Sequence, residues 1–530
     1  MFKKDQIFEF TACLFILVLS ILLQAQILVT GDITWLMRIG EKFLAGGHYY
    51  TDFFEVNPPM CIYIYLIPVL MSKLFAITFT TSLLIYSYSI AIGSWLFCYS
   101  LFKKILQDSK SFYRINLTIF LTFLYFILPA HAFGQREYLF VVLFMPYLLI
   151  TVLRAKQQIY CRGLTLLAGL LAGIGLAQKP FFLSTWLLIE LYLILKFKNI
   201  FYGLRNETLA IIGVLCFYAI SIFVLTPEYL TKILPIINTF YYVQVQFPII
   251  VLLLRPILVY SAILFFLYSF SQQYCRQKEL LAILLLATFS GLIIYLMQHT
   301  LWFYHTLPLA TFSALLCTAL VSEYWQRNNL FLIQDVDRET LKKLIYNIIL
   351  FLLLTFPIGI GVYSQLGSFK QAVDFFDKPT FKLAKSNPGK SIFIFTEDIT
   401  TNYPFFDYTQ VATPSKFPCL WLISAAERLS ATIKAPVTQQ KAQDTKEFVI
   451  NTTIDDLLQN QPSYIFIERY DNYYAVYKKH SLIYTTKLLY QHPANNHFDT
   501  FMQNPRFQHF WQNYRYQGDL GNFSVYQKFR

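Results

Sequence analysis

The sequence predicts an α-helical polytopic membrane protein that ends in a small soluble α/β domain. Of its 530 residues, 56% are hydrophobic and 14% are charged, and the mean hydropathy is +0.47; a soluble globular chain carries about 25% charged residues. Apolar runs of about 18 residues or more recur from Ile7 to Tyr363 and then stop. We therefore expect a membrane module over residues 1–364, with a first outer loop over 30–78, and a water-exposed domain over 365–530.

The formal net charge of +13 does not indicate a nucleic-acid partner. The basic residues lie mainly in short loops between apolar runs, where an excess of Lys and Arg reports membrane topology. The eight cysteines show neither a disulfide framework nor a CxxC metal spacing. Nothing resembles a phosphate-binding glycine loop or the His and Glu spacing of a zinc protease.

The first apolar run, Ile7 to Val29, is preceded by Lys3 and Lys4. It exceeds the usual length of a signal-peptide core and has no small-x-small cleavage site. We therefore expect a retained first helix whose N-terminus lies in the cytoplasm.

The side on which each later loop lies depends on whether Met60 to Ala76 crosses the membrane. If it crosses, three successive loops rich in Lys and Arg lie outside, which contradicts the positive-inside rule. If Pro58 to Ala76 instead lies in the outer interface, as its short length and its prolines allow, every basic loop lies inside. We therefore expect eleven crossings, outer juxtamembrane helices and a C-terminal domain on the outer side. The expected spans are residues 7–29, 79–102, 115–133, 138–153, 163–178, 180–196, 207–225, 249–271, 279–298, 305–323 and 344–364.

This topology gathers the outer polar residues into five short segments, which are residues 30–59, 131–137, 178–180, 227–248 and 298–308. Each segment contains groups that lipid tolerates poorly. We therefore expect the segments to converge on one outward-facing polar cavity.

The C-terminal part contains runs rich in β-branched and aromatic residues, which predict strands. These runs are Ser391 to Thr396, Ser463 to Ile467 and Asn522 to Gln527. Two further stretches, Ala425 to Ile433 and Thr453 to Gln459, have the pattern of helices. Together these elements predict a small α/β domain.

Four acidic residues stand out in the first outer loop, namely Asp32, Glu41, Asp52 and Glu55. Asp32 follows the first span and begins a stretch with apolar side chains at helical spacing. An aspartate at such a position commonly caps a helix. Capping and catalysis do not exclude each other, so both roles stay open for Asp32.

The order of these features resembles the C-type glycosyltransferase superfamily, in particular the lipid A aminoarabinose transferases and the protein O-mannosyltransferases. The shared pattern is an Asp just past the first span, a short helix, and then a Gly, a Tyr and a Glu before Pro. The matching residues are Asp32, Gly46, Tyr50, Glu55, Pro58 and Pro59. The alternation of spans extends the likeness to about Pro308. The chain departs from the family at Ile33, where members often have a second acid, and at Val56, where a Lys often follows the Glu.

The resemblance implies a donor sugar carried on a polyprenyl phosphate. In the family the Asp after the first span is the base. Asp32 would therefore take a proton from an acceptor hydroxyl or amine, which attacks the anomeric carbon while the lipid phosphate leaves. Such a single displacement inverts the anomeric centre and needs positive charge beside the phosphate. The acceptor would be an envelope lipid, a glycan or a protein.

Glu55 is a second catalytic candidate, and Asp52 is a candidate for binding substrate. Either acid could position the acceptor or a divalent cation, and either could instead belong to a solvated interface loop. The sequence indicates no other cofactor and no bound metal with a recognisable ligand spacing.

Residues of the other outer segments are candidates for binding the donor phosphate. Arg136 would hold the phosphate with its planar fork of donors, and Glu137 would orient that group or face the acceptor. Lys179 resembles a Lys at the same place in the aminoarabinose transferases, with Pro180 replacing a Gly. The alternative for each of these residues is a role as an interface anchor.

Arg255 lies inside the apolar run VLLLRPIL, so we expect it to face the cavity or a lipid headgroup. His299, Tyr304 and His305 lie in the last outer segment, where family members place residues that contact the lipid phosphate. Either His could donate a hydrogen bond to the leaving phosphate. The alternative is an aromatic belt at the membrane interface.

Three functional classes follow from these features. The first is a glycosyltransferase at the outer face of a bacterial-type inner membrane. The second is a flippase or transporter of lipid-linked glycans without chemistry, which predicts charge through the depth of the bundle and repeat symmetry. The acids cluster at one face and no repeat is visible, so the sequence favours the transferase. The third is an inactive scaffold whose outer domain binds envelope glycans.

Overall fold

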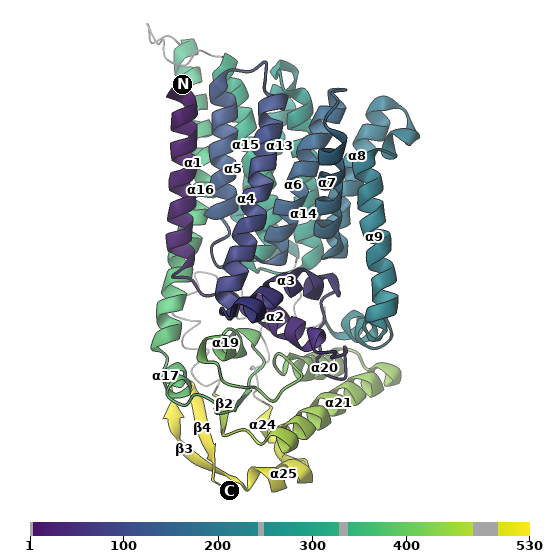
Figure 1. Cartoon of the computed structure of the whole chain (residues 1–530), viewed down its shortest axis with the longest axis vertical. Helices are drawn as coiled ribbons and strands as arrows, with labels where there is room; N and C mark the ends of the chain where they lie inside the picture. The colour runs from purple at the N-terminus through teal and green to yellow at the C-terminus, as the bar shows by residue number, and fades with distance from the viewer. Residues whose placement is uncertain (1–3, 242–248, 328–337, 470–496, 530) are drawn as a thin grey trace. The chain divides into compact units, whose positions relative to one another are not determined.

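The computed structural model describes residues 4–241, 249–327, 338–469 and 497–529. The chain forms two compact units (Figure 1). The helical unit comprises Met1–Leu28, Thr81–Ser221 and Pro248–Lys370, and the mixed unit comprises Val29–Thr80, Ile222–Phe247 and Gln371–Arg530.

Apolar helices make up the helical unit, and the longer of them run alongside one another in Figure 1. They are α1 (Lys4–Gln24), α4 (Phe79–Ile105), α5 (Ser111–Phe126), α6 (Arg136–Ala155), α7 (Arg162–Ala177), α8 (Leu183–Phe197), α9 (Asn206–Leu225), α12 (Ile249–Leu253), α13 (Pro256–Ser271), α14 (Lys278–Gln298), α15 (Leu307–Arg327) and α16 (Arg338–Asp377). Helix α6 packs against α7, α14 and α15 at the centre of the unit. Nearly every residue of α6 is buried, which explains why its sequence is apolar on all sides.

Every predicted span coincides with a helix, but the helices differ in length. In the described part of the chain, eight helices are long and apolar enough to cross a membrane. Helices α5, α7 and α13 have 16 residues each, which gives about 24 Å at 1.5 Å per residue, less than the roughly 30 Å of a hydrocarbon core. The predicted span 249–271 is interrupted before Pro256, because proline lacks an N–H and disfavours helix at the preceding residue. The count of eleven crossings stays a prediction.

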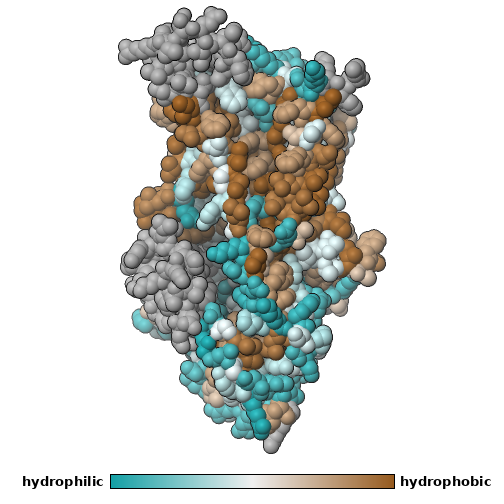
Figure 2. Space-filling model, turned by 90° about the vertical axis from the view of Figure 1, so that its left-hand side faces the viewer, coloured by the Kyte–Doolittle hydropathy of each residue, from teal (hydrophilic) through white to brown (hydrophobic). Residues whose placement is uncertain are grey.

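The surface of the helical unit is hydrophobic. Large apolar side chains are exposed on its outer helices, among them Phe15 on α1, Phe217 on α9 and Phe351 on α16. Figure 2 shows such residues covering much of one face of these helices. Exposed apolar surface on this scale is stable only in contact with lipid. The chain is therefore an integral membrane protein.

The mixed unit contains the first outer loop as two helices, α2 (Gly31–Leu44) and α3 (Met60–Phe75). They pack closely, because Gly40 of α2 faces Leu66 and Val69 of α3. The helix α3 corresponds to the stretch that we expect to lie in the outer interface. Its contacts group it with the C-terminal residues.

The segment after α9 also belongs to the mixed unit. It forms two π-helical turns, η4 (Tyr229–Ile233) and η5 (Ile237–Tyr241), on either side of the short helix α10 (Leu234–Ile236). Residues 242–248, which complete the predicted outer segment 227–248, lie outside the described residues.

The C-terminal residues form a four-stranded sheet in the order β1-β2-β4-β3. Strand β1 (Ile392–Phe395) is parallel to β2 (Tyr464–Glu468), and β4 (Phe523–Lys528) is antiparallel to both β2 and β3 (Tyr514–Leu520). Phe466 is paired with Val525 at the centre of the sheet. The accompanying helices are α17 (Pro379–Lys385), α18 (Ile399–Asn402), α19 (Phe405–Thr409), α20 (Trp421–Thr432), α21 (Pro436–Asn460), α24 (Phe498–Met502) and α25 (Pro505–Trp511).

The predicted α/β domain is confirmed. All three predicted strands and both predicted helices are present, but the sequence did not indicate β3 or the full length of α21. Helix α16 runs without a break to Asp377, past residue 364, where we expect the membrane module to end.

Candidate active site

Asp32 lies in the first turn of α2, and its side chain is partly exposed. The residue at the N-cap position is Thr30, so of the two roles left open for Asp32 the capping role is wrong. A carboxylate in the first turn is nevertheless favoured by the partial positive charge at the start of a helix. The helix thus holds Asp32 at its start, and the residue is partly exposed there.

Glu55 is buried, and it is tied to α2 by one hydrogen bond and to its own loop by two others. The indole Nε1 of Trp35 donates to Glu55 Oε2 over 2.7 Å. The backbone N–H of Asn57 donates to Glu55 Oε1 over 2.6 Å, and the Asn57 side-chain amide donates to the same oxygen. Because donors of the protein itself satisfy both carboxylate oxygens, Glu55 fixes the loop before Pro58 against α2.

Asp52 is exposed and closes a local turn. Its Oδ2 accepts hydrogen bonds from the His48 backbone N–H over 2.8 Å and from the Thr51 hydroxyl over 3.1 Å. The hydrogen bond from His48 lowers the pKa of the Asp52 carboxyl. These contacts are those of a turn-forming residue.

A half-buried ion pair joins α2 to the C-terminal residues of the mixed unit. Arg38 Nη2 lies 2.7 Å from Asp407 Oδ1, and Arg38 Nη1 lies 2.9 Å from Glu41 Oε2. The ring of Trp35 packs on that of Tyr403, with centroids 5.1 Å apart. The ion pair and the ring contact therefore hold α2 against the C-terminal residues of the mixed unit.

The part of the loop that follows α2 is held by a ring stack and by a backbone hydrogen bond. The Tyr50 ring stacks on Phe448 of α21 with centroids 4.6 Å apart and planes 2° from parallel. The Phe54 backbone N–H donates to the Lys416 carbonyl over 3.0 Å. The first outer loop is thus an ordered part of the mixed unit.

A second polar cluster lies within the helical unit and joins four residues that are far apart in the sequence. Lys179 Nζ lies 2.5 Å from Glu137 Oε1 and 2.9 Å from Gln298 Oε1. His305 Nε2 lies 3.3 Å from both Lys179 Nζ and Glu137 Oε1. We call Glu137, Lys179, Gln298 and His305 the Lys179 cluster. All four residues are buried.

Other predicted residues surround this cluster. Arg136 precedes Glu137 in the first turn of α6 and is buried, with 2% of its surface exposed. The Tyr304 ring lies edge-on to His305, with centroids 4.5 Å apart, and its centroid is 6.0 Å from Lys179 Nζ. Lys179 and Arg136 both lie within electrostatic range of His305, and this concentration of positive charge makes the region suitable for an anion.

Two further predicted residues belong to the helical unit, and one of them, His299, directly follows Gln298 of the Lys179 cluster. His299 ends α14 with a positive φ of 50°, and Arg255 precedes α13, beside Tyr295 of α14. Among the described residues, the hydrogen bonds that join the Lys179 cluster include neither His299 nor Arg255.

The described residues contain no group of three or more His, Cys, Asp or Glu side chains suited to hold a metal ion. The four acids of the first outer loop are accordingly spread over α2 and the turns that follow it. The role of a divalent cation at this loop stays a prediction.

Several residues at these clusters were missed by the sequence reasoning. Gln298 is uncharged, as is Thr300, whose hydroxyl is hydrogen-bonded to His305 Nδ1, and only their place in the last outer segment could have drawn attention to them. Asp407 lies 369 residues from its partner Arg38, so no local pattern links the two. Glu190, whose carboxylate is paired with Arg205 in the helical unit, carried a usable signal, because it interrupts the apolar run LLIELYLIL.

A scan against protein-family models finds no match for this sequence, and a search of curated proteins finds none either. Among solved structures, the chain is similar to ArnT from Cupriavidus metallidurans in the apo state, with a TM-score of 0.53, 9% sequence identity and 97% of both chains covered. It also matches the archaeal oligosaccharyltransferase AglB from Archaeoglobus fulgidus, in complex with an inhibitory peptide and a dolichol-phosphate. That match has a TM-score of 0.43 and 11% identity, and it covers 87% of this chain and 70% of that chain.

ArnT is a lipid A aminoarabinose transferase with the C-type glycosyltransferase fold. The likeness spans the full chain and confirms the predicted fold, a polytopic helical module followed by a small α/β domain. The resemblance noted in the sequence is thus confirmed at the level of the fold.

Proposed function

We propose that this protein is a glycosyltransferase that moves a sugar from a polyprenyl-phosphate donor to an envelope lipid, glycan or protein on the outer face of the membrane. The observation that carries the proposal is the place of Asp32, a partly exposed residue in the first turn of α2 just after the first span, in a chain with the fold of ArnT. The location in a bacterial inner membrane, with the C-terminal domain outside, belongs to the same proposal.

Asp32 acts as the base in this mechanism. Its carboxylate takes the proton from the acceptor hydroxyl or amine as that atom attacks the anomeric carbon. The bond between the anomeric carbon and the phosphate oxygen breaks in the same step, and the polyprenyl phosphate leaves with the electron pair. The displacement inverts the anomeric configuration.

The Lys179 cluster and Arg136 serve the leaving group. Lys179 supplies a point charge and Arg136 supplies a planar fork of donors, and both stabilise the charge that develops on the phosphate. Glu137 holds the Lys179 ammonium through the 2.5 Å contact, and Gln298 holds it through the 2.9 Å contact. The ammonium is therefore oriented before the donor arrives.

The remaining candidates support this arrangement. Glu55 acts through Trp35 by holding α2 in place, and Asp52 shapes the turn beside the acceptor. His305 and Tyr304 contact the phosphate side, next to Lys179. Arg255 and His299 keep a proposed role in donor binding that rests on their position in the sequence.

The experiment compares cells that lack the gene with cells that carry the wild-type gene or an Asp32→Asn variant. Mass spectrometry of the envelope lipids and glycans should show one modification that disappears with the gene and returns with the wild type. Asp32→Asn should fail to restore it, although the purified variant has the elution volume and melting temperature of the wild type. Asp444→Asn, on the exposed face of α21, is the matched control and should restore it.

Full restoration by Asp32→Asn would show that Asp32 is not the base. The flippase alternative predicts that the donor lipid changes leaflet and that no new glycosidic bond forms. Detection of the glycosylated product in vesicles that contain only the purified protein, donor and acceptor would separate the two functions.

A further inference from the structure

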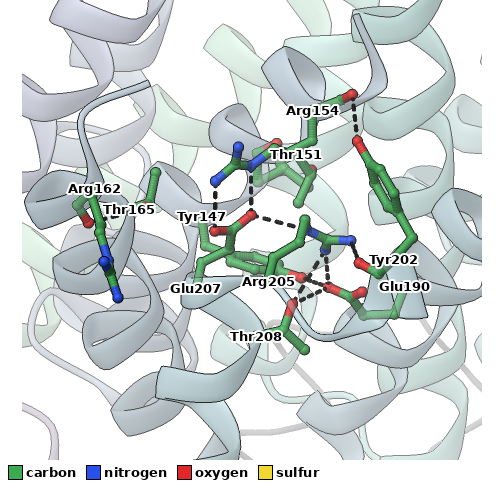
Figure 3. A network of polar contacts seen from close by, with 11 residues as sticks. Tyr147, Thr151, Arg154, Arg162, Thr165, Glu190, Tyr202, Arg205, Glu207 and Thr208 are labelled. Atoms are coloured by element: carbon green, nitrogen blue, oxygen red, sulfur yellow. Dashed lines mark hydrogen bonds and ion pairs between the residues drawn. The ribbon is translucent and has the colours of Figure 1, made fainter. Parts of the chain in front are cut away.

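Helices α6, α8 and α9 share a network of charged side chains within the helical unit (Figure 3). Arg154 of α6 binds both carboxylate oxygens of Glu207, over 2.8 and 3.0 Å. Arg205 bridges two carboxylates, with Nε 2.9 Å from Glu207 Oε1 and Nη2 2.6 Å from Glu190 Oε1. Thr208 donates to Glu190 Oε1 over 3.1 Å, and the Tyr147 hydroxyl donates to the same oxygen. We call these six residues the arginine–glutamate network.

The network is buried in an apolar part of the chain. The Glu207 side chain is fully buried, and the side chains of Glu190 and Arg205 are each 9% exposed. Charges at such positions are costly unless they are paired, and here two arginines balance two glutamates. Glu190 lies inside the expected span 180–196, and an ionisable group retained inside a membrane span commonly serves a function. The proposed transfer chemistry uses none of these six residues.

The network holds the beginning of α9, because Arg205 immediately precedes this helix and Glu207 lies in its first turn. Two glycines of α7 allow the first turns of α9 to approach α7 closely. An added Cβ would lie 2.3 Å from the Glu207 carbonyl at Gly169 and 2.8 Å from Val214 Cβ at Gly173. The spacing of these glycines is that of the GxxxG motif, which lets two membrane helices approach closely.

The second half of α9 makes little contact with protein. Phe217 is 76% exposed and Phe223 is 69% exposed. The position of this part of the helix is therefore set mainly by its first turns.

The chain continues from α9 into the segment 226–241, which contacts the first outer loop within the mixed unit. The Tyr229 ring is buried and lies edge-on to Tyr49, with centroids 5.6 Å apart. Tyr229 also lies within electrostatic range of Glu55. Glu228 Oε1 is 3.8 Å from His48 Nδ1.

We propose that the arginine–glutamate network positions α9 and thereby holds the segment 226–241 against the first outer loop. Glu190, Arg205 and Glu207 are then positioning residues for the acceptor side of the reaction. The inference of a role in acceptor binding rests on the proposed function, whereas the coupling between the network and the segment does not.

Hydrogen–deuterium exchange of the purified full-length protein tests the coupling without any substrate. The first variant is Glu207→Gln, which removes the charge shared by both arginines and keeps the shape of the side chain. The second is the double variant Arg154→Gln with Glu207→Gln. It removes a positive and a negative charge together, so that Arg154 is not left as an unpaired buried charge that destabilises the fold. Phe217→Leu, on the exposed face of α9, is the matched control.

We expect amide exchange in residues 226–241 to become about tenfold faster in both network variants, with exchange in α14 and α15 unchanged and the control like the wild type. Unchanged exchange in 226–241 would overturn the proposal. Faster exchange throughout the protein would also overturn it, because it would show that the network only stabilises the fold.

A transferase assay then separates the two proposals. A raised KM for the acceptor in the double variant supports the role in acceptor binding, whereas coupling in a protein without transferase activity would overturn the proposed function alone.

Discussion

Asp407 is a buried carboxyl group whose pKa is raised to about 6, because burial disfavours its charged form. Arg38 favours the charged form and only partly offsets this effect. The folded protein therefore keeps a proton that the unfolded chain releases near pH 3.8. Folding stability is consequently lost as the pH rises from about 4 through about 6. The difference of about 2.2 between the two pKa values corresponds to about 3 kcal/mol.

An Asp407→Asn variant should remove this pH dependence, because an amide does not ionise. We expect the melting temperature of the wild type, relative to the variant, to fall between pH 4.5 and pH 6.5 and then to level off, as measured by scanning fluorimetry in detergent. An Asp455→Asn variant, at an exposed ion pair of α21, serves as the control and should run parallel to the wild type over this range. Parallel curves for Asp407→Asn and the wild type would show that the proton is not held in the folded protein.

The sequence indicated most residues of the Lys179 cluster, but it did not indicate Asp407, the partner of Arg38. Glu137, Lys179 and His305 could each be predicted, because polar groups in short segments beside apolar spans are unusual. Their assembly into one cluster follows from the packing of α6, α14 and α15, which brings three distant segments together. Asp407 gave no such signal, because it lies in a soluble domain where acids are common.

At the scale of elements, the start of α2 depends on the absence of a side chain at Gly31. A Cβ at this position would lie 2.4 Å from the Tyr403 carbonyl oxygen and 3.1 Å from the carbonyl carbon. These are backbone atoms, so they cannot rotate away as a side chain could. The first turn of α2, which carries Asp32, can therefore lie against residue 403 only with glycine at position 31.

A Gly31→Ala variant should shift the first turn of α2 and lower stability by about 1–3 kcal/mol, the usual cost of an overpacked contact. We expect a lower melting temperature together with reduced transfer, because the Asp32 carboxylate moves with the turn. Gly93→Ala, in the middle of α4, is the control, since an added Cβ there meets no atom within 4 Å. A Gly31→Ala protein with wild-type stability and activity would contradict this account of the contact.

Elements differed in how well local patterns revealed them. The strands β1 and β2 are buried along their whole length, so their β-branched and aromatic residues predicted them. Strand β3 has the sequence YRYQGDL and is mostly exposed, and its pairing with β4 is what makes it a strand. Helix α21 was only partly predicted, because most of its first half is exposed and polar and has no apolar stripe.

At the scale of the whole molecule, composition was enough to separate apolar spans from a soluble C-terminal part. It was not enough to show that residues 29–80 and 222–247 group with the C-terminal residues in one unit. That grouping depends on contacts such as Tyr49 with Tyr229 and Tyr50 with Phe448, which join segments about 180 and 400 residues apart. Aromatic residues in loops gave no local sign of their partners.

The predicted topology can be tested with reporter fusions placed by the structure. Ser109 lies between α4 and α5, Ala76 follows α3, and Asp377 ends α16. If α3 does not cross the membrane, a fusion after Ser109 should lie in the cytoplasm and fusions after Ala76 and Asp377 should lie outside. Alkaline phosphatase, active outside, and green fluorescent protein, fluorescent inside, report the two sides.

The reverse pattern at all three positions would mean that α3 crosses the membrane, because one added span moves every later loop to the other side. Fusions after Ser109 and Asp377 on the same side would instead contradict the count of eleven crossings. The physical basis of the expected result is the distribution of Lys and Arg. Lys103, Lys104 and Lys110 flank the Ser109 position, and cationic loops of this kind are retained in the cytoplasm. The first outer loop, with Asp32, would then lie on the same side as the C-terminal domain with which it forms one unit.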